Sequence, residues 1–220
     1  NAFSLFYIVC VLHSPRAWAM MDEEGVKRLL SQVREAQGTT RNDLAAALSK
    51  VAAKAEDAML LELGCYSDSF VQWLWTEEPL VRAYTACILA NIAFLEKGQQ
   101  SVLDNGGVKP LVQLLKNKED KKVTLHATAA IQNLTYKNTS CCSSVLEEGG
   151  EKALKKLLQH KSEDVQQFAA GALANLQLYR RAADEAASAT PNAPPLVKGK
   201  MTLNKKVKQI LRRRSTDDKS

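Results

Sequence analysis

Apolar side chains recur at helical spacing through the middle of the chain. Between residues 108 and 115 they stand at Val108, Leu111, Val112, Leu114 and Leu115, which is the spacing of one face of an amphipathic helix. No stretch of the chain shows sustained alternation of apolar and polar residues, the pattern typical of a half-buried strand. The pattern therefore predicts an all-helical protein without a sheet.

The pattern repeats along the chain. The segment VLDNGGVKPLVQLLKNKEDKKVTLHATAAIQNLTY (Val102 to Tyr136) aligns with VLEEGGEKALKKLLQHKSEDVQQFAAGALANLQLY (Val145 to Tyr179). An earlier segment, FVQWLWTEEPLVRAYTACILANIAF (Phe70 to Phe94), aligns with the later part of both, and a weaker copy with GVKRLL and NDLAAALSKVAA precedes it. Paired glycines and short charged loops separate the apolar stretches, as expected at turns between helices.

Three asparagines mark the period of this repeat. Asn91, Asn133 and Asn175 stand 42 residues apart near the ends of three similar helices, and Ser49 takes this place in the weak copy. Such a period is typical of one supersecondary unit stacked on copies of itself, in which neighbours supply the core and one long surface stays free to bind. The sequence predicts a right-handed α-solenoid of three full units and one degenerate N-terminal unit.

The repeated motifs resemble those of armadillo repeats. The resemblance rests on the Gly-Gly turn, the short LVxLL helix and the long A-A-x-A-L-x-N-L helix, and it covers Phe70 to Tyr179 well and Gly25 to Ala53 weakly. It implies a solenoid of about three to four armadillo-type repeats, with each asparagine on the concave face of the third helix of its unit. It also implies a non-catalytic adaptor or scaffold that binds other proteins through an extended peptide segment or a partner helix.

The predicted groove contains the residues seven and four positions before each asparagine, because these offsets share a helix face. Its members are Tyr84, Cys87, Asn91, His126, Ala129, Asn133, Phe168, Gly171 and Asn175. The rings either wall the groove or pack between repeats, and the asparagines either bond a peptide or make a local backbone bond or loop cap. Nuclear-import receptors of this fold carry tryptophan four residues before the asparagine. The small residues at this position here disfavour recognition of basic nuclear signals.

Composition and motifs give no support for an enzyme. The chain is 45% hydrophobic and 25% charged, as in soluble globular proteins, and it has only three histidines. It has no phosphate-binding GxxxxGK, no GxGxxG, no HExxH and no GxSxG. We therefore expect no catalytic residue, metal, cofactor or small-molecule substrate.

The positive charge is concentrated at the C-terminus. The whole chain has a formal net charge of +6. Residues 196–220 hold nine Lys and Arg against two Asp and so carry +7, which leaves −1 for the rest of the chain. A linker with the breaker-rich SATPNAPP precedes the tail, which gives a solenoid at 21–181, a linker at 182–195 and a tail at 196–220. Six of these nine cations are clustered between residues 205 and 214, and we expect them to form the basic site of the tail: Lys205, Lys206, Lys208, Arg212, Arg213 and Arg214.

The tail reads as a basic amphipathic helix, since Leu203, Val207, Ile210 and Leu211 share one face. Such a helix binds a membrane, an acidic protein surface, a partner's groove or nucleic acid, acts as a nuclear-import signal, or folds back on its own repeats. A solvated, partly disordered end is the simplest alternative. Ser215 follows three arginines, as in a basophilic kinase site, and phosphate there would cancel part of the charge.

The first twenty residues stand apart from the repeats. The chain opens with Asn, and the apolar stretch from Ala2 to Leu12 lacks the basic start of a signal peptide and is too short to span a bilayer. We favour Met20 or Met21 as the natural start, with residues 1–20 foreign to the native protein. An odd number of cysteines at no framework spacing indicates a reducing compartment. We therefore expect a protein of the cytoplasm, with the nucleus as a second location.

Overall fold

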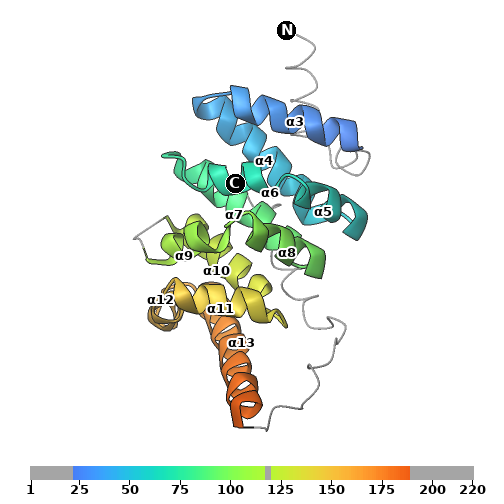
Figure 1. Ribbon diagram of the computed structural model, residues 1–220. Helices are drawn as coiled ribbons and strands as arrows, with labels where there is room; N and C mark the ends of the chain where they lie inside the picture. The colour runs from blue at the N-terminus through green and yellow to red at the C-terminus, as the bar shows by residue number, and fades with distance from the viewer. Residues whose placement is uncertain (1–21, 117–119, 189–220) are drawn as a thin grey trace, which may run out of the picture.

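The computed structural model describes residues 22–116 and 120–188, and they form a stack of helices that runs from one end of the molecule to the other (Figure 1). The helices are α3 (Glu23–Glu35), α4 (Gly38–Lys54), α5 (Asp57–Gly64), α6 (Ser67–Trp73), α7 (Pro79–Ile92), α8 (Glu96–Asp104), α9 (Val108–Lys116), α10 (Lys121–Thr135), α11 (Thr139–Glu147), α12 (Gly150–Leu157) and α13 (Glu163–Ser188). No strand occurs within these two ranges. The predicted all-α solenoid is confirmed.

The helices fall into three full units of three helices each and one shorter unit. The full units are α5–α6–α7, α8–α9–α10 and α11–α12–α13, and α3 and α4 form the shorter N-terminal unit. The most extensive contacts between elements join α7 to α10, α10 to α13 and α4 to α7. The third helices of successive units therefore pack side by side and form one continuous layer.

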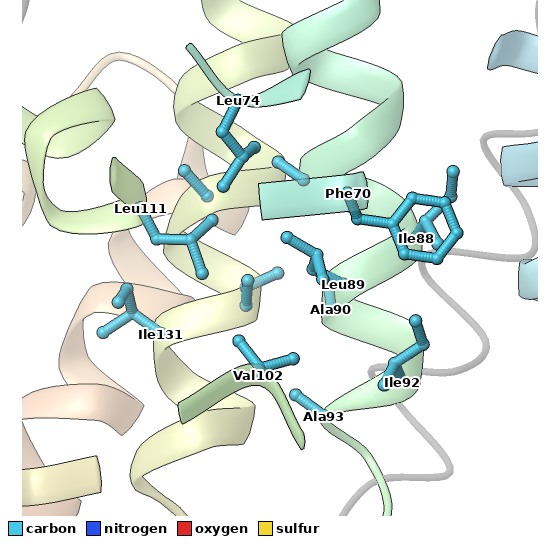
Figure 2. Packing of buried hydrophobic residues seen from close by; sticks show 14 of the residues in the cluster. Phe70, Leu74, Ile88, Leu89, Ala90, Ile92, Ala93, Val102, Leu111 and Ile131 are labelled. Atoms are coloured by element: carbon cyan, nitrogen blue, oxygen red, sulfur yellow. The ribbon is translucent and has the colours of Figure 1, made fainter. Parts of the chain in front are cut away.

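The hydrophobic core lies between units as much as within them. Figure 2 shows Phe70 of α6 and Leu89 of α7 in one cluster with Val102 of α8, Leu111 of α9 and Ile131 of α10. All five side chains are fully buried, although they come from two different units. Each unit thus obtains a large part of its buried apolar surface from its neighbour, as the repeat period predicts.

The paired glycines fix the turn between the first and second helix of a unit. Gly106 and Gly149 have φ values of 71° and 72°, a backbone conformation that L side chains rarely adopt. At the next position a Cβ on Gly150 would lie 2.7 Å from Val145 Cγ1, 2.9 Å from the Val145 carbonyl oxygen and 3.3 Å from Val112 of the preceding unit. The first glycine therefore allows the turn, and the second allows close packing of the helices.

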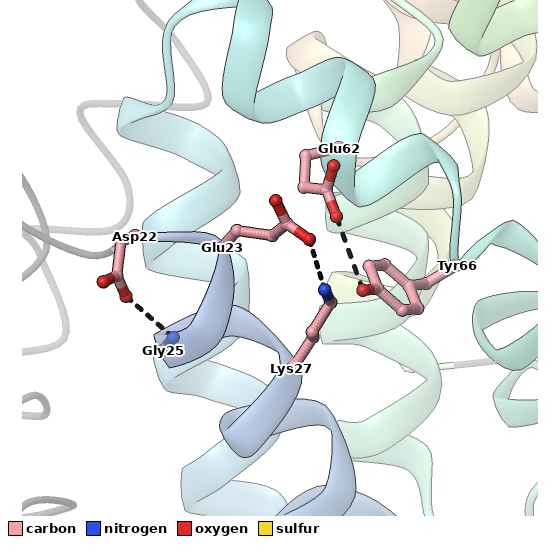
Figure 3. Close-up of polar contacts among 6 residues, drawn as sticks. All are labelled: Asp22, Glu23, Gly25, Lys27, Glu62 and Tyr66. Carbon is pink, nitrogen blue, oxygen red and sulfur yellow. Dashed lines mark hydrogen bonds and ion pairs between the residues drawn. The ribbon is translucent and has the colours of Figure 1, made fainter.

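The N-terminal end of the stack is closed by a polar helix surface. The Asp22 carboxylate accepts a hydrogen bond from the Gly25 backbone N–H at 2.9 Å, which caps α3, and Glu23 pairs with Lys27 along its exposed side. Close by, the Tyr66 hydroxyl donates to Glu62 at 3.4 Å (Figure 3). A terminal repeat has only one neighbour, so a charged outer face keeps this end soluble.

The C-terminal end is formed by α13, which continues to Ser188. Residues 182–188 are therefore helical and not part of the linker that the sequence predicts from 182 onward. The alanine-rich sequence AADEAAS explains this, because alanine has the highest helix propensity. Residues 1–20, the rest of the linker, the basic tail and Ser215 lie outside the described residues, so the predictions for them remain predictions.

We expect Gly150→Ala to destabilise the protein by about 1–3 kcal/mol, because the new methyl group must displace the backbone carbonyl and side chain of Val145. Chemical denaturation followed by helical circular dichroism measures this. Gly64→Ala is the matched control, since a Cβ there would meet only Ile92 Cγ2 at an ordinary 3.7 Å. Equal stability of the two variants would contradict the close packing described here.

Candidate peptide-binding surface

The nine predicted groove residues all lie on the third helices, and their exposure divides them into two groups. Five are buried: Cys87, Asn91, Ala129, Asn133 and Phe168. Four are half-buried: Tyr84, His126, Gly171 and Asn175. The second group is therefore the part of the predicted groove that reaches the surface.

Two asparagines form hydrogen bonds between neighbouring units. The Asn133 side-chain amide donates to the carbonyl oxygen of Ala90 on α7 at 2.7 Å. One unit later, the Asn175 amide donates at 3.2 Å to the carbonyl oxygen of Gln132 on α10 and at 3.2 Å to Thr135 Oγ1. In both cases the carbonyl belongs to the residue 43 positions earlier, so the same bond joins two successive pairs of third helices.

The first two units use this position differently. The Asn91 amide donates to the Cys87 carbonyl oxygen at 2.8 Å, and the Ser49 hydroxyl donates to the Ala46 carbonyl oxygen at 2.8 Å. Both bonds stay within one helix and correspond to the local backbone bond that the sequence leaves open. The bonds between units that Asn133 and Asn175 form are neither of the two predicted alternatives.

The small residues four positions before the asparagines give room to the neighbouring helix. A Cβ on Gly171 would lie 2.2 Å from Nε2 of Gln132, so the Gln132 side chain of α10 crosses α13 at this glycine. Ala129 is fully buried, and Cys87 is 6% exposed with its Sγ 3.8 Å from the Asn91 amide nitrogen. These positions therefore serve packing between third helices.

The rings seven positions before the asparagines are not equivalent. Phe168 is only 2% exposed and belongs to the hydrophobic cluster, which is the packing role that the sequence leaves open. Tyr84 packs against the same cluster but is half-buried, as is His126. Tyr84 and His126 therefore occupy equivalent positions on adjacent third helices, with part of each ring at the surface.

A buried polar network that the sequence analysis does not predict lies at the end of α10. Gln99 is 2% exposed, and its amide donates to the carbonyl oxygens of Asn133 at 2.8 Å and Tyr136 at 3.2 Å. The Asn138 amide donates to Gln99 Oε1 at 3.2 Å. The next unit has Cys142 at the place of Gln99, so the repeat pattern carries no signal for this network.

The thiols in the third and first helices are protonated at neutral pH. Burial raises the pKa of the Cys87, Cys141 and Cys142 thiols to about 12, whereas Cys65 is exposed.

Within residues 22–116 and 120–188 no group of three or more His, Cys, Asp or Glu is arranged to hold a metal ion. Of the helices in these ranges, none is long and apolar enough to cross a membrane.

Comparison with known proteins identifies one armadillo repeat in the chain and a shared fold. A sequence profile described as Armadillo/beta-catenin-like repeat matches residues 96–136, which contain α8, α9 and α10. No curated protein matches the chain. A solved structure of an engineered protein is 26% identical with a TM-score of 0.70, over 80% of this chain and 72% of that one.

Two designed proteins share the fold at lower identity. A computationally designed armadillo repeat protein for modular peptide recognition is 22% identical with a TM-score of 0.71, over 85% of this chain and 81% of that one. Another, solved in complex with the peptide (KR)4, is 21% identical with a TM-score of 0.62, over 77% and 80%. The stacked three-helix units define an α-solenoid of the kind seen in designed armadillo repeat proteins, and its second full unit matches the armadillo repeat in sequence.

We expect Asn133→Ala to lower the free energy of unfolding by about 1–3 kcal/mol, because it leaves the buried Ala90 carbonyl without this donor. Asn105→Ala is the control, since the exposed Asn105 amide bonds only within its own turn, to the Ser101 carbonyl oxygen. Urea denaturation of both variants measures the difference. A loss no greater than that of the control would show that the bond between units contributes nothing measurable.

Proposed function

We propose that this protein is a non-catalytic interaction module that binds an extended peptide segment or a partner helix along the layer of third helices. The observation that carries the proposal is the equivalent placement of Tyr84 and His126 on α7 and α10, which pack side by side. Part-exposed rings at a regular interval offer apolar contacts to side chains of an extended chain. We place the protein in the cytoplasm, and also in the nucleus.

The peptide contacts in this proposal differ from those that the sequence predicts, in which each repeated asparagine bonds the peptide. The amide nitrogens of Asn133 and Asn175 already donate to carbonyl oxygens of α7 and α10, so recognition falls mainly to the half-buried rings and to the exposed part of Asn175. Rings provide most of the affinity in many interfaces because they bury a large area with few rotatable bonds. The proposed site is therefore centred on α7, α10 and α13.

The designed protein bound to (KR)4 supports a peptide as the ligand of this fold. The residues of this chain argue against a basic peptide. That complex shows that one designed protein of this fold binds a peptide. Here the positions four before the asparagines are Cys87, Ala129 and Gly171, and none offers an aromatic wall for a lysine or arginine side chain. We therefore propose ligands with apolar side chains at regular intervals.

The test begins with a peptide that the full-length protein selects from a displayed random library. The affinity of this peptide is then measured for the wild type and for variants. We expect Tyr84→Ala and His126→Ala each to weaken its binding by at least about 1 kcal/mol, or roughly fivefold in Kd, by fluorescence anisotropy. Tyr136→Ala, a half-buried tyrosine at the opposite end of α10, is the matched control. Unchanged affinity in folded Tyr84→Ala and His126→Ala proteins would place the site elsewhere. We expect (KR)4 to bind weakly.

A second candidate function is supported by the charge distribution. The protein would then be a structural or targeting component that attaches to an acidic surface through residues 196–220, since this segment carries +7 and the rest of the chain only −1. A nearly neutral body has little attraction for polyanions, so the tail would dominate such binding. Phosphate on Ser215 would weaken it by adding roughly −2 of charge.

For this candidate we expect binding to anionic vesicles to fall steeply with salt, because exposed charges are screened over about 10 Å at 0.1 M. The comparison is between the full chain and a full-length variant with Arg212, Arg213 and Arg214 replaced by Gln. The variant should bind more weakly and respond less to salt. Equal binding of the two proteins would remove the tail from this role.

A further inference from the structure

Comparison of the units with one another reveals two apolar residues in unusual places. Trp75 and Leu80 are 53% and 40% exposed, among the few large apolar side chains at the surface of the described residues. The equivalent positions are Lys116 and Lys122 in the second full unit, and Gln159 and Asp164 in the third. The fold therefore accepts polar residues at both places, and packing does not account for the tryptophan and leucine.

The loop between these two residues is held in place. The Arg82 guanidinium donates to the Thr76 carbonyl oxygen at 2.7 Å, and Arg41 of α4 pairs with Glu78 at 2.9 Å. An exposed tryptophan and leucine on a fixed loop form a pre-organised apolar contact site, which a docking partner covers without having to order the loop first. We call Trp75, Leu80 and the loop 76–78 the corner patch.

The corner patch contains two glutamates, of which only Glu78 is balanced by an ion pair with an arginine. Glu77 is exposed and takes part in no ion pair with the described part of the chain, and the Glu78 side chain keeps 27% exposure beside Arg41. Asp120 is exposed in the corresponding loop before α10. An apolar centre beside carboxylates is complementary to a segment with an apolar stripe and cations on either side.

We propose that the corner patch binds residues 202–214 of this same protein, TLNKKVKQILRRR. This segment has Leu203, Val207, Ile210 and Leu211 at the spacing of one helix face, and six Lys and Arg around them. The tail sums to +7, so its cations are complementary to the exposed Glu77 carboxylate beside the apolar pair. The proposal does not depend on the peptide-binding function.

The chain after α13 is long enough to return along that helix. Residues 189–201 span roughly 45 Å when extended, and α13 with its 26 residues is about 39 Å long. The segment can therefore return along α13 to the repeats, and a second copy of the protein can supply it equally well. Leu80 lies one helical turn before Tyr84, so a docked tail borders the proposed peptide site.

The test is limited trypsin cleavage of the tail in the full chain, with the synthetic peptide 196–220 as the unprotected reference. A tail docked nine-tenths of the time is cleaved about tenfold more slowly than a free one, because trypsin acts on the undocked form. We expect this protection in the wild type. It should be lost in Trp75→Gln/Leu80→Gln and in Val207→Gln/Ile210→Gln. None of these changes adds a trypsin site.

Leu178→Gln is the matched control, because Leu178 is 62% exposed on α13 and lies far from the loop in sequence. It should keep the protection, and circular dichroism should show unchanged helicity in every variant. Protection that is independent of protein concentration places the tail on its own chain, and protection that grows with concentration places it on a second copy. Both outcomes support the proposal. Equal cleavage of wild type and Trp75→Gln/Leu80→Gln would overturn it, as would a wild-type tail cleaved as fast as the peptide.

Discussion

The structure depends on one constraint, that a three-helix unit of this chain has too little apolar surface of its own to form a core. Each unit therefore packs against the next, and the three full units are joined by contacts that recur from one full unit to the next. Gly150 lets α12 approach Val145 and Val112, and Asn133 reaches from α10 to the Ala90 carbonyl of α7. Since these contacts recur with the period of the sequence, the third helices are held in one continuous layer, and that layer is the surface available for binding.

Close packing of the third helices also limits what the layer can recognise. The small residues at positions 87, 129 and 171 bring the helices together, and Gln132 lies across Gly171 as a result. The Asn133 and Asn175 amides then find carbonyl acceptors on the neighbouring helix at hydrogen-bonding distance. A side chain engaged in this way stabilises the stack and offers less to a ligand, which shifts the proposed peptide contacts to the half-buried Tyr84 and His126.

The sequence predicted the units well because their determinants are local. The period of 42 residues, the helical spacing of Val108 to Leu115 and the Gly-Gly turns defined three full units and one short one, and the structure confirms them. The surface was harder to predict, because helix face alone does not tell whether an amide meets solvent or the next helix. Asn133 and Phe168 lie on the same face of their own helices as Tyr84 does on α7, and they are nevertheless buried. The helix α13 continues to Ser188, beyond the repeat pattern, because loss of the pattern does not require loss of helix.

Repetition within one chain gives a physical way to separate packing from binding. Two units with the same backbone impose nearly the same packing demands, so a residue that all units share is explained by the fold. A residue that only one unit carries at an exposed position needs another explanation. Val102 and Val145 illustrate the first kind in the two full units that have a Gly-Gly turn, since both lie beneath the second glycine of that turn. Trp75 is of the second kind, because the polar residues Lys116 and Gln159 occupy the same place in the other two full units. A binding role is therefore assigned to Trp75 on stronger grounds than to the repeated asparagines, although only the asparagines stand out in the sequence.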